Sequence, residues 1–332
     1  MKSGVRKMAG SAHHSAPDRQ LTWPLSALIV LAAAFFATTA DAQELYKYQD
    51  ENGDWIFADR PPDNGQEVES RELQKSTADA IVDVTHSFEG RIVQLTARND
   101  FFAPVELRLE IVTISGLTFP RADQPMTWVL PARSKTVLFE LETQDNGNER
   151  FLEYGFRYMP GDPAATHNAA EPYRAPFAMS SNHQITQAYP EAVTHTAPDS
   201  YFAVDVEMPI GTDIVAARDG IVFDVASKNF RGGLDPKIDG PSANVVRILH
   251  DDGTYAVYAH LNTNTIRVKP GDRVERGQYI ADSGNTGFTS GPHLHFAVVR
   301  NVGLRVESVP VTFLGPDLDG VVPASGNVLT AY

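Results

Sequence analysis

The fold of this chain is decided by the stretch Gly291-Pro292-His293-Leu294-His295-Phe296-Ala297-Val298-Val299. A Gly-Pro opening followed by an apolar, partly β-branched run predicts a buried β-strand. Successive side chains of a strand point to opposite faces, so His293 and His295 are expected to enter one site, with Leu294 packed behind them. An isolated pair of this kind is more often a surface feature, so its meaning depends on the rest of the chain.

Two further alternating segments offer partners for this pair. Residues 255–261 predict a strand that ends at His260, which we expect to face the same way as Tyr258. Residues 202–206 place Asp205 inside an apolar strand. Burial of a carboxylate there without a partner would destabilise the folded chain by roughly several kcal/mol. A metal cation and a backbone-capping role are the two alternatives for that partner.

Several short motifs occur in a fixed order around these residues. They are Ala203–Val206, Pro209–Thr212, Ala216–Val222, Tyr258–Leu261, Val268–Val274, Gly277–Ile280, Ser283–Gly287 and Gly291–Phe296. On these motifs, residues 183–312 resemble the lysostaphin/LytM-type zinc metallopeptidases, which cleave peptide cross-links in bacterial cell walls. The resemblance implies a compact, mostly antiparallel β-sheet with a metal groove on one face.

The resemblance also implies roles for particular residues. Asp205 and His295 match metal ligands, and Zn²⁺ is the implied cofactor. His260 and His293 match the catalytic histidines that act on the water and the transition state, and either could be the base. A His-Glu-x-x-His helix is absent from the sequence, so the site is not a helix-borne zinc site.

The third ligand departs from the commonest form of that family. Four residues before Asp205, where that form has a histidine, this chain has Tyr201. His195 lies ten residues before Asp205, and some relatives resemble this arrangement of a histidine turn and a short polar insert. We therefore expect residues 197–200 to loop out and return His195 to the metal. The alternative is a degenerate site.

Composition narrows the classes of function. The 332 residues carry a formal net charge of −14, which disfavours nucleic acid as the main partner. There is no cysteine, so thiol catalysis, disulfides, iron–sulfur clusters and cysteine-based zinc sites are excluded. We assign structural roles to the other downstream histidines: a hairpin end for His250, and loops without a metal-like partner for His167 and His183.

The N-terminal region predicts export. Basic residues precede the apolar run Leu25–Ala37, and Ala40-Asp41-Ala42 follows as a small-x-small cleavage pattern. We expect residues 1–42 to be a signal peptide, which leaves no stable membrane span after cleavage and places the protein in the periplasm or cell envelope. An uncleaved anchor is the alternative.

The remaining chain divides into three expected parts, and the fold class is mainly β. Residues 43–76 hold a small β-hairpin around Asn52-Gly53 and a linker, and resemble a small periplasmic module of unknown function. Residues 77–180 alternate with period two at 91–97, 105–111 and 136–141, as in a β-sandwich-like domain. Residues 181–332 form the lysostaphin-like antiparallel β-sheet domain.

Two functions from different classes follow. One is an exported zinc metalloendopeptidase that hydrolyses peptidoglycan cross-link peptides and remodels the cell wall. The other is a catalytically inactive LytM-type regulator that binds peptidoglycan or activates an amidase. In both, peptidoglycan is the partner, and a cell-wall protein is a further candidate. Asp205, His260, His293 and His295 are all present and only the first ligand, expected at His195, is displaced, which favours the enzyme.

Overall fold

The computed structural model describes residues 81–119, 126–144 and 150–332 in full, together with the backbone of four strands at 2–10, 44–49, 55–58 and 69–72. Strands dominate, and the one helix in these ranges is the 3-10 turn η1 (Gly240–Ser242). The mainly β class is thereby confirmed. Among the described residues, no helix has the length and apolar character needed to cross a membrane.

The N-terminal module is a three-stranded antiparallel sheet of order β3-β2-β4. β2 (Glu44–Gln49) pairs with β3 (Trp55–Ala58), which confirms the expected hairpin. β4 (Glu69–Glu72) adds a third strand that we did not predict. The Asn52-Gly53 turn, the apolar run at 25–37 and the cleavage pattern lie outside the described residues. The signal peptide therefore stays a prediction.

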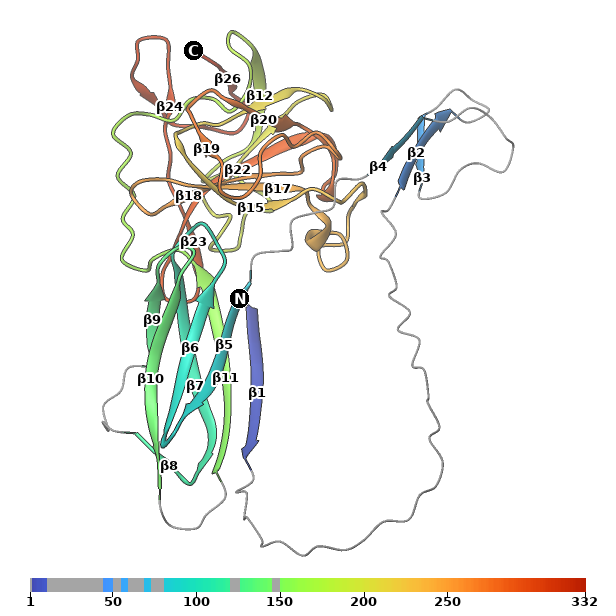
Figure 1. Ribbon diagram of the computed structural model, residues 1–332. Coiled ribbons are helices and arrows are strands. Elements are labelled where there is room, and N and C mark those ends of the chain that lie inside the picture. Colours follow the sequence, from blue (N-terminus) through green and yellow to red (C-terminus); the bar gives the residue numbers. More distant parts are fainter. Residues whose placement is uncertain are drawn as a thin grey trace, which may run out of the picture. The chain divides into compact units, whose positions relative to one another are not determined.

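Two four-stranded sheets form the β-sandwich (Figure 1). One has the order β1-β11-β7-β9, and the other has the order β5-β6-β10-β8. The edge strand β1 lies within residues 1–42, so cleavage of the predicted signal peptide would remove it and leave β11 at the edge. Their bounds are β1 (Lys2–Gly10), β5 (Val82–Glu89), β6 (Ile92–Asn99), β7 (Val105–Ser115), β8 (Leu117–Thr118), β9 (Thr127–Leu130), β10 (Lys135–Thr143) and β11 (Arg150–Pro160). Leu95 and Leu141 from one sheet pack with Leu107, Leu109 and Leu152 from the other, as the alternating pattern predicts.

A nine-stranded sheet dominates the C-terminal part, with the order β19-β15-β17-β18-β22-β13-β12-β26 and β23 paired to β22. Its strands are β12 (Asn182–Gln187), β13 (Val204–Glu207), β15 (Gly220–Ala226), β17 (Val245–Leu249), β18 (Tyr255–Ala259), β19 (Arg273–Val274), β22 (His293–Asn301), β23 (Val306–Val309) and β26 (Val328–Thr330). Short pairs surround it: β14 (Asp213–Val215) with β20 (Tyr279–Asp282), β16 (Gly232–Gly233) with β21 (Gly287–Phe288), and β24 (Phe313–Leu314) with β25 (Gly320–Val321).

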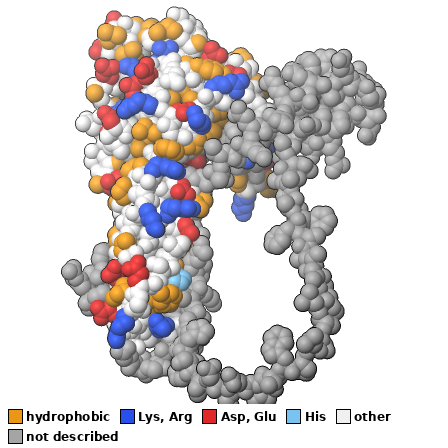
Figure 2. Space-filling model, viewed as in Figure 1, with side chains coloured by type: hydrophobic (Ala, Val, Ile, Leu, Met, Phe, Trp, Pro, Cys, Tyr) orange, Lys and Arg blue, Asp and Glu red, His pale blue; other side chains and the backbone are white. Residues whose placement is uncertain are grey.

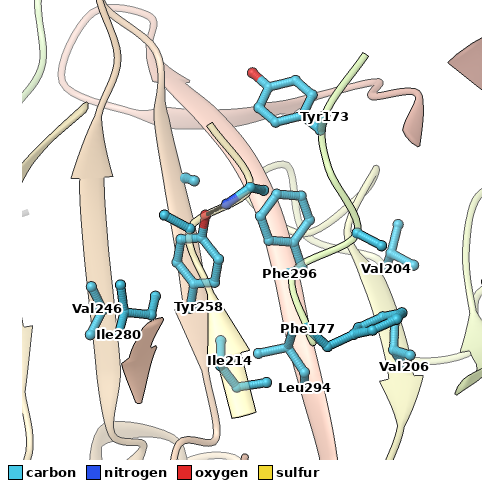
Figure 3. Close-up of a cluster of buried hydrophobic side chains, with 14 of the residues drawn as sticks. Tyr173, Phe177, Val204, Val206, Ile214, Val246, Tyr258, Ile280, Leu294 and Phe296 are labelled. Carbon is cyan, nitrogen blue, oxygen red and sulfur yellow. Dashed lines mark hydrogen bonds between the residues drawn. The ribbon is translucent and has the colours of Figure 1, made fainter. Parts of the chain in front are cut away.

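One face of this sheet, the core face, carries the large apolar side chains of β13, β18 and β22 (Figure 3). Leu294 and Phe296 are fully buried there, and the Tyr258 hydroxyl accepts a hydrogen bond from the Ala217 backbone N–H at 2.8 Å. Each large side chain buried in this way contributes about 1.5–3 kcal/mol. A slip of one residue would move all of them to the other face, so the core fixes the register of β22.

The opposite face, which we call the histidine face, carries Asp205, His293 and His295. Further along β22, Ala297 and Val299 of the same face pack into the sandwich core. The contact has a polar anchor, because the buried Glu106 of β7 accepts hydrogen bonds from Asn301 Nδ2 at 2.8 Å and from the Leu304 backbone N–H at 2.7 Å. The sandwich and the sheet therefore share one packed interior at this end.

Candidate metal centre and active site

The centre of the site is set by the pairing of β13 with β22. Asp205 lies directly opposite His295 in the antiparallel register, and Glu207 lies opposite His293. Opposed residues of an antiparallel pair point to the same side, so carboxylate and imidazole meet. Asp205 Oδ1 lies 2.9 Å from His295 Nδ1, and the aspartate is only 4% exposed. The expected positions of His293 and His295 on one face are those observed.

His195 reaches this pair from the loop between β12 and β13. Its Nε2 lies 3.1 Å from Asp205 Oδ2, and its ring meets that of His295 edge-on with centroids 5.0 Å apart. The structure therefore brings His195, Asp205 and His295 together, with one ligand atom from each within 4.8 Å of the others. Two imidazoles and a carboxylate match the N/O donor set that Zn²⁺ takes in catalytic sites.

The Asp205 carboxylate is held in its ionised form. Burial alone would raise the pKa of Asp205, but the hydrogen bonds and charges of His195 and His295 lower it, and the net pKa lies well below the usual range. An ionised carboxylate inside an imidazole cluster is stable only with donors or a cation around it. The arrangement thus suits a cation at this point.

His260 and His293 stand beside this group, with ring centroids 4.5 Å apart. His260 Nδ1 lies 2.7 Å from the Thr286 carbonyl oxygen, and His293 Nδ1 lies 2.8 Å from the Gly291 carbonyl oxygen. A carbonyl oxygen can only accept, so both Nδ1 atoms carry the proton and each Nε2 presents a lone pair. Burial, with His293 and His295 nearby, lowers the pKa of His260 to about 3 and so favours its neutral form. The two Nδ1 contacts leave Nε2 as the nitrogen of each ring that is available to other groups.

The expected direction of His260 was wrong. Tyr258 lies on the core face, whereas His260 joins the histidines of the opposite face. The reason is local: His260 follows the last residue of β18 and has a left-handed backbone, with φ of +61°. That conformation breaks the alternation of the strand and turns the imidazole toward His293.

The remaining predicted residues fall outside the cluster. Tyr201 is 44% exposed, and its ring contacts Tyr189 and Phe202. His250 ends the β17 hairpin, where its Nδ1 donates to the Asp219 carbonyl oxygen at 2.7 Å. His183 lies in β12 rather than in a loop, and its ring meets Phe177 edge-on.

His167 lies in a loop as expected, with a ring nitrogen 3.2 Å from the Tyr173 hydroxyl. None of these four side chains belongs to the three-residue group. The structural roles predicted for His167, His183 and His250 agree with these contacts.

One neighbour of the cluster carries no signal in the sequence. Gln187, the last residue of β12, donates a hydrogen bond from Nε2 to Asp205 Oδ2 at 2.7 Å. A glutamine at a strand end carries no motif, and its sheet partner is decided by tertiary pairing. The carbonyls of Thr286 and Gly291 were likewise not foreseen as partners of the two histidines.

Comparison with known proteins supports this picture. Residues 200–307 match the model of Peptidase family M23, and residues 31–80 match a Domain of unknown function (DUF4124). The first match contains Asp205, His260, His293 and His295, whereas His195 lies five residues before it begins.

Among curated relatives, the glycyl-glycine endopeptidase ALE-1 of Staphylococcus capitis is 32% identical over 31% of this chain and 25% of its own length. The peptidoglycan DD-endopeptidase ShyA of Vibrio cholerae is 34% identical over 42% of this chain and 30% of its own length. The similarity to these relatives thus spans less than a third of their lengths.

Among solved structures, the catalytic domain of lysostaphin from Staphylococcus simulans is 28% identical, with 39% of this chain and 83% of that chain covered and a TM-score of 0.27. The family match and the residues it contains carry the assignment: the chain includes a domain of Peptidase family M23, at residues 200–307.

Proposed function

We propose that this protein is an exported zinc metalloendopeptidase that hydrolyses peptide cross-links of bacterial peptidoglycan. The observation that carries the proposal is the buried Asp205 carboxylate held between His195 Nε2 and His295 Nδ1. In this proposal His195, Asp205 and His295 are the metal ligands, and His260 and His293 are the catalytic residues. Residues 1–42 direct export to the periplasm or cell envelope, and residues 43–76, 77–180 and 181–332 are the module and two domains that follow.

The donor set fits zinc. Catalytic zinc sites use three protein ligands and keep one position for water, and two neutral imidazoles with one carboxylate leave a net positive centre. When bound, the ion would polarise the scissile carbonyl and lower the pKa of its water toward about 7. The low pKa of Asp205 keeps the carboxylate ligand ionised across the neutral range.

The chain's own histidines supply the proton transfers. One imidazole accepts a proton at Nε2 from the attacking water as the oxygen bonds to the carbonyl carbon of the scissile amide. The imidazolium so formed donates that proton to the amide nitrogen as the carbon–nitrogen bond breaks. The neighbouring histidine stands where it can stabilise the tetrahedral oxyanion. The Thr286 and Gly291 carbonyls keep both rings in the required tautomer throughout.

The names of the relatives support a wall peptide as substrate. One is named a glycyl-glycine endopeptidase and another a peptidoglycan DD-endopeptidase, so a peptide bond is the shared target and the cross-link differs. The proposed substrate is therefore a cross-link peptide of the cell wall, without a choice between types of cross-link. Among the coloured side chains in Figure 2, acidic and basic groups are interspersed, whereas nucleic acid requires a continuous basic patch.

The test combines metal content with wall digestion. The purified mature protein should retain close to one Zn²⁺ per molecule by elemental analysis, as three ligands on one centre predict. It should also release muropeptides of lower cross-linking from isolated sacculi. His295→Ala removes one of three ligands and should abolish both results. A folded wild-type protein that stays metal-free after zinc incubation would contradict the enzyme and favour the inactive regulator.

A further inference from the structure

Gln187 joins the two halves of the metal centre through one side-chain amide. Its Nε2 donates to Asp205 Oδ2 at 2.7 Å. Its Oε1 accepts hydrogen bonds from the backbone N–H groups of Val193 and Thr194, both at 2.9 Å. The Thr194 hydroxyl also lies within hydrogen-bond distance of both amide atoms, at 3.0 and 3.1 Å. The strand that carries Asp205 and the loop that carries His195 are therefore tied to the same group.

A β-bulge is what brings Gln187 to this position. Ile185 pairs with Val206 on the core face, and the register then shifts so that Gln187 rather than Thr186 lies opposite Asp205. On a regular strand Ile185 and Gln187, which are two residues apart, would point to the same face. The extra residue in β12 turns Gln187 to the histidine face, as bulges do near functional sites.

The ring of His195 lacks the support that the neighbouring histidines have. His260 and His293 are each fixed through Nδ1 by a backbone carbonyl. His195 Nδ1 is buried and has no hydrogen-bond partner among the described residues. Metal-binding histidines usually donate their second N–H to an outer partner, which fixes the ring orientation. Apart from its Nε2 contact with Asp205 and its ring contact with His295, the orientation of His195 depends on the loop backbone, and Gln187 holds the two residues that precede it.

We propose that Gln187 is the positioning residue that makes the displaced ligand His195 competent to bind the metal. It holds the 193–195 turn against Asp205, in place of an outer partner on the imidazole itself. The inference rests on the proposed metal site but assigns a role to a residue outside its ligand set. It also explains how a histidine ten residues from Asp205 can serve where Tyr201 stands in the usual position.

The test compares Gln187→Met with Gln184→Met in the full mature protein. Both residues are glutamines of β12, but Gln184 is exposed and its backbone pairs with Val328, away from the centre. Zinc affinity is measured by competition with a chromophoric chelator. Gln187→Met should weaken binding about 10–100-fold, the range typical of outer-shell changes, whereas Gln184→Met should leave it unchanged.

Two further readouts separate positioning from general stability. The visible absorption spectrum of the Co²⁺-loaded protein reports ligand geometry and should change in Gln187→Met but not in Gln184→Met. Thermal unfolding of the metal-free proteins should be similar in both variants. If Gln187→Met does not fold, Thr194→Val tests the same link from the exposed end and should weaken zinc binding several-fold, less than the about 10–100-fold of the first variant.

The outcomes distinguish this inference from the function beneath it. Wild-type protein that binds neither zinc nor cobalt would overturn both. Wild-type protein that binds zinc, together with Gln187→Met or Thr194→Val of unchanged affinity and cobalt spectrum, would overturn the role of Gln187 and leave the metal site standing.

Discussion

The two ends of the histidine face of β22 differ in what covers them. At the first end, His293 and His295 keep 15% and 18% of their side chains exposed. At the other end, Ala297 and Val299 are buried in the sandwich core, and Asn301 holds the buried Glu106. The same alternation therefore places the histidine cluster where the face meets solvent and an apolar contact where the sandwich covers it. The alternation of a strand determines which side chains share a face, and the surrounding structure determines whether that face is exposed or buried.

A second contrast lies within the reactive end. Asp205 and His295 are placed by strand register, which the apolar core behind them protects from slipping. His195 lies in a loop, and the backbone N–H groups of the two residues before it, Val193 and Thr194, donate to Gln187. Substitutions in the loop, beside the metal group and at the covered end should therefore differ in their effects on zinc binding, hydrolysis and stability.

The largest effect is expected from His195→Ala. Removal of a ligand should weaken zinc binding by more than the about 10–100-fold that outer-shell changes cost, and hydrolysis of sacculi should be lost with the metal. Tyr201→Phe is the matched control, because Tyr201 is 44% exposed and contacts other aromatic rings. Zinc content and muropeptide release measure both. Equal zinc affinity in His195→Ala and wild type would show that the loop histidine is no ligand.

The next effect is expected from His260→Ala and His293→Ala. Both histidines lie beside the three-residue group: His293 Nε2 is 3.9 Å from Asp205 Oδ2, and the His260 and His295 ring centroids are 5.8 Å apart. Each variant should therefore retain zinc while hydrolysis falls about 10²–10⁴-fold, the usual scale of acid–base assistance. His167→Ala serves as a control, since its ring contacts Tyr173 instead. Near wild-type turnover in both variants would mean that the proton transfers are made elsewhere.

The smallest effect on the metal site is expected from substitutions at the end of β22 that the sandwich covers. Glu106→Ala removes the side-chain acceptor of the Leu304 N–H and one of the two acceptors of Asn301 Nδ2, the other being the Gly161 carbonyl oxygen. The loss should lower the free energy of unfolding by about 1–3 kcal/mol. Zinc affinity should not change, because the contact lies at the other end of the strand face. Glu110→Ala on the same strand removes only a surface pair with Arg157 and should cost about 0–1 kcal/mol. Chemical denaturation of both variants measures the free energy of unfolding, and zinc titration measures the affinity for the metal.

A variant of Glu106 that loses zinc would show that the sandwich contact and the metal centre are coupled. That result would contradict the separation of the two ends.

Several features were accessible from the sequence because they depend on short-range physics. Alternation placed His293 and His295 on one face, and the apolar run around Asp205 indicated its strand. The hairpin at 45–57 and three of the sandwich strands, β6, β7 and β10, followed from the same period of two, whereas the other strands of the sandwich were not predicted. The direction of His260 did not, because one left-handed residue after β18 reversed it.

By itself, the sequence determined the mainly β class, the faces of the regular strands and the family of residues 200–307, since each depends on local pattern and on the order of motifs. Only the tertiary structure decided that Gln187 meets Asp205, because a single extra residue in β12 sets which side chain faces the site. It also decided that the sandwich covers one end of β22, because that contact joins residues nearly two hundred positions apart, as Asn301 and Glu106 are. No periodicity records such a pairing, since it arises when separate sheets find a common core.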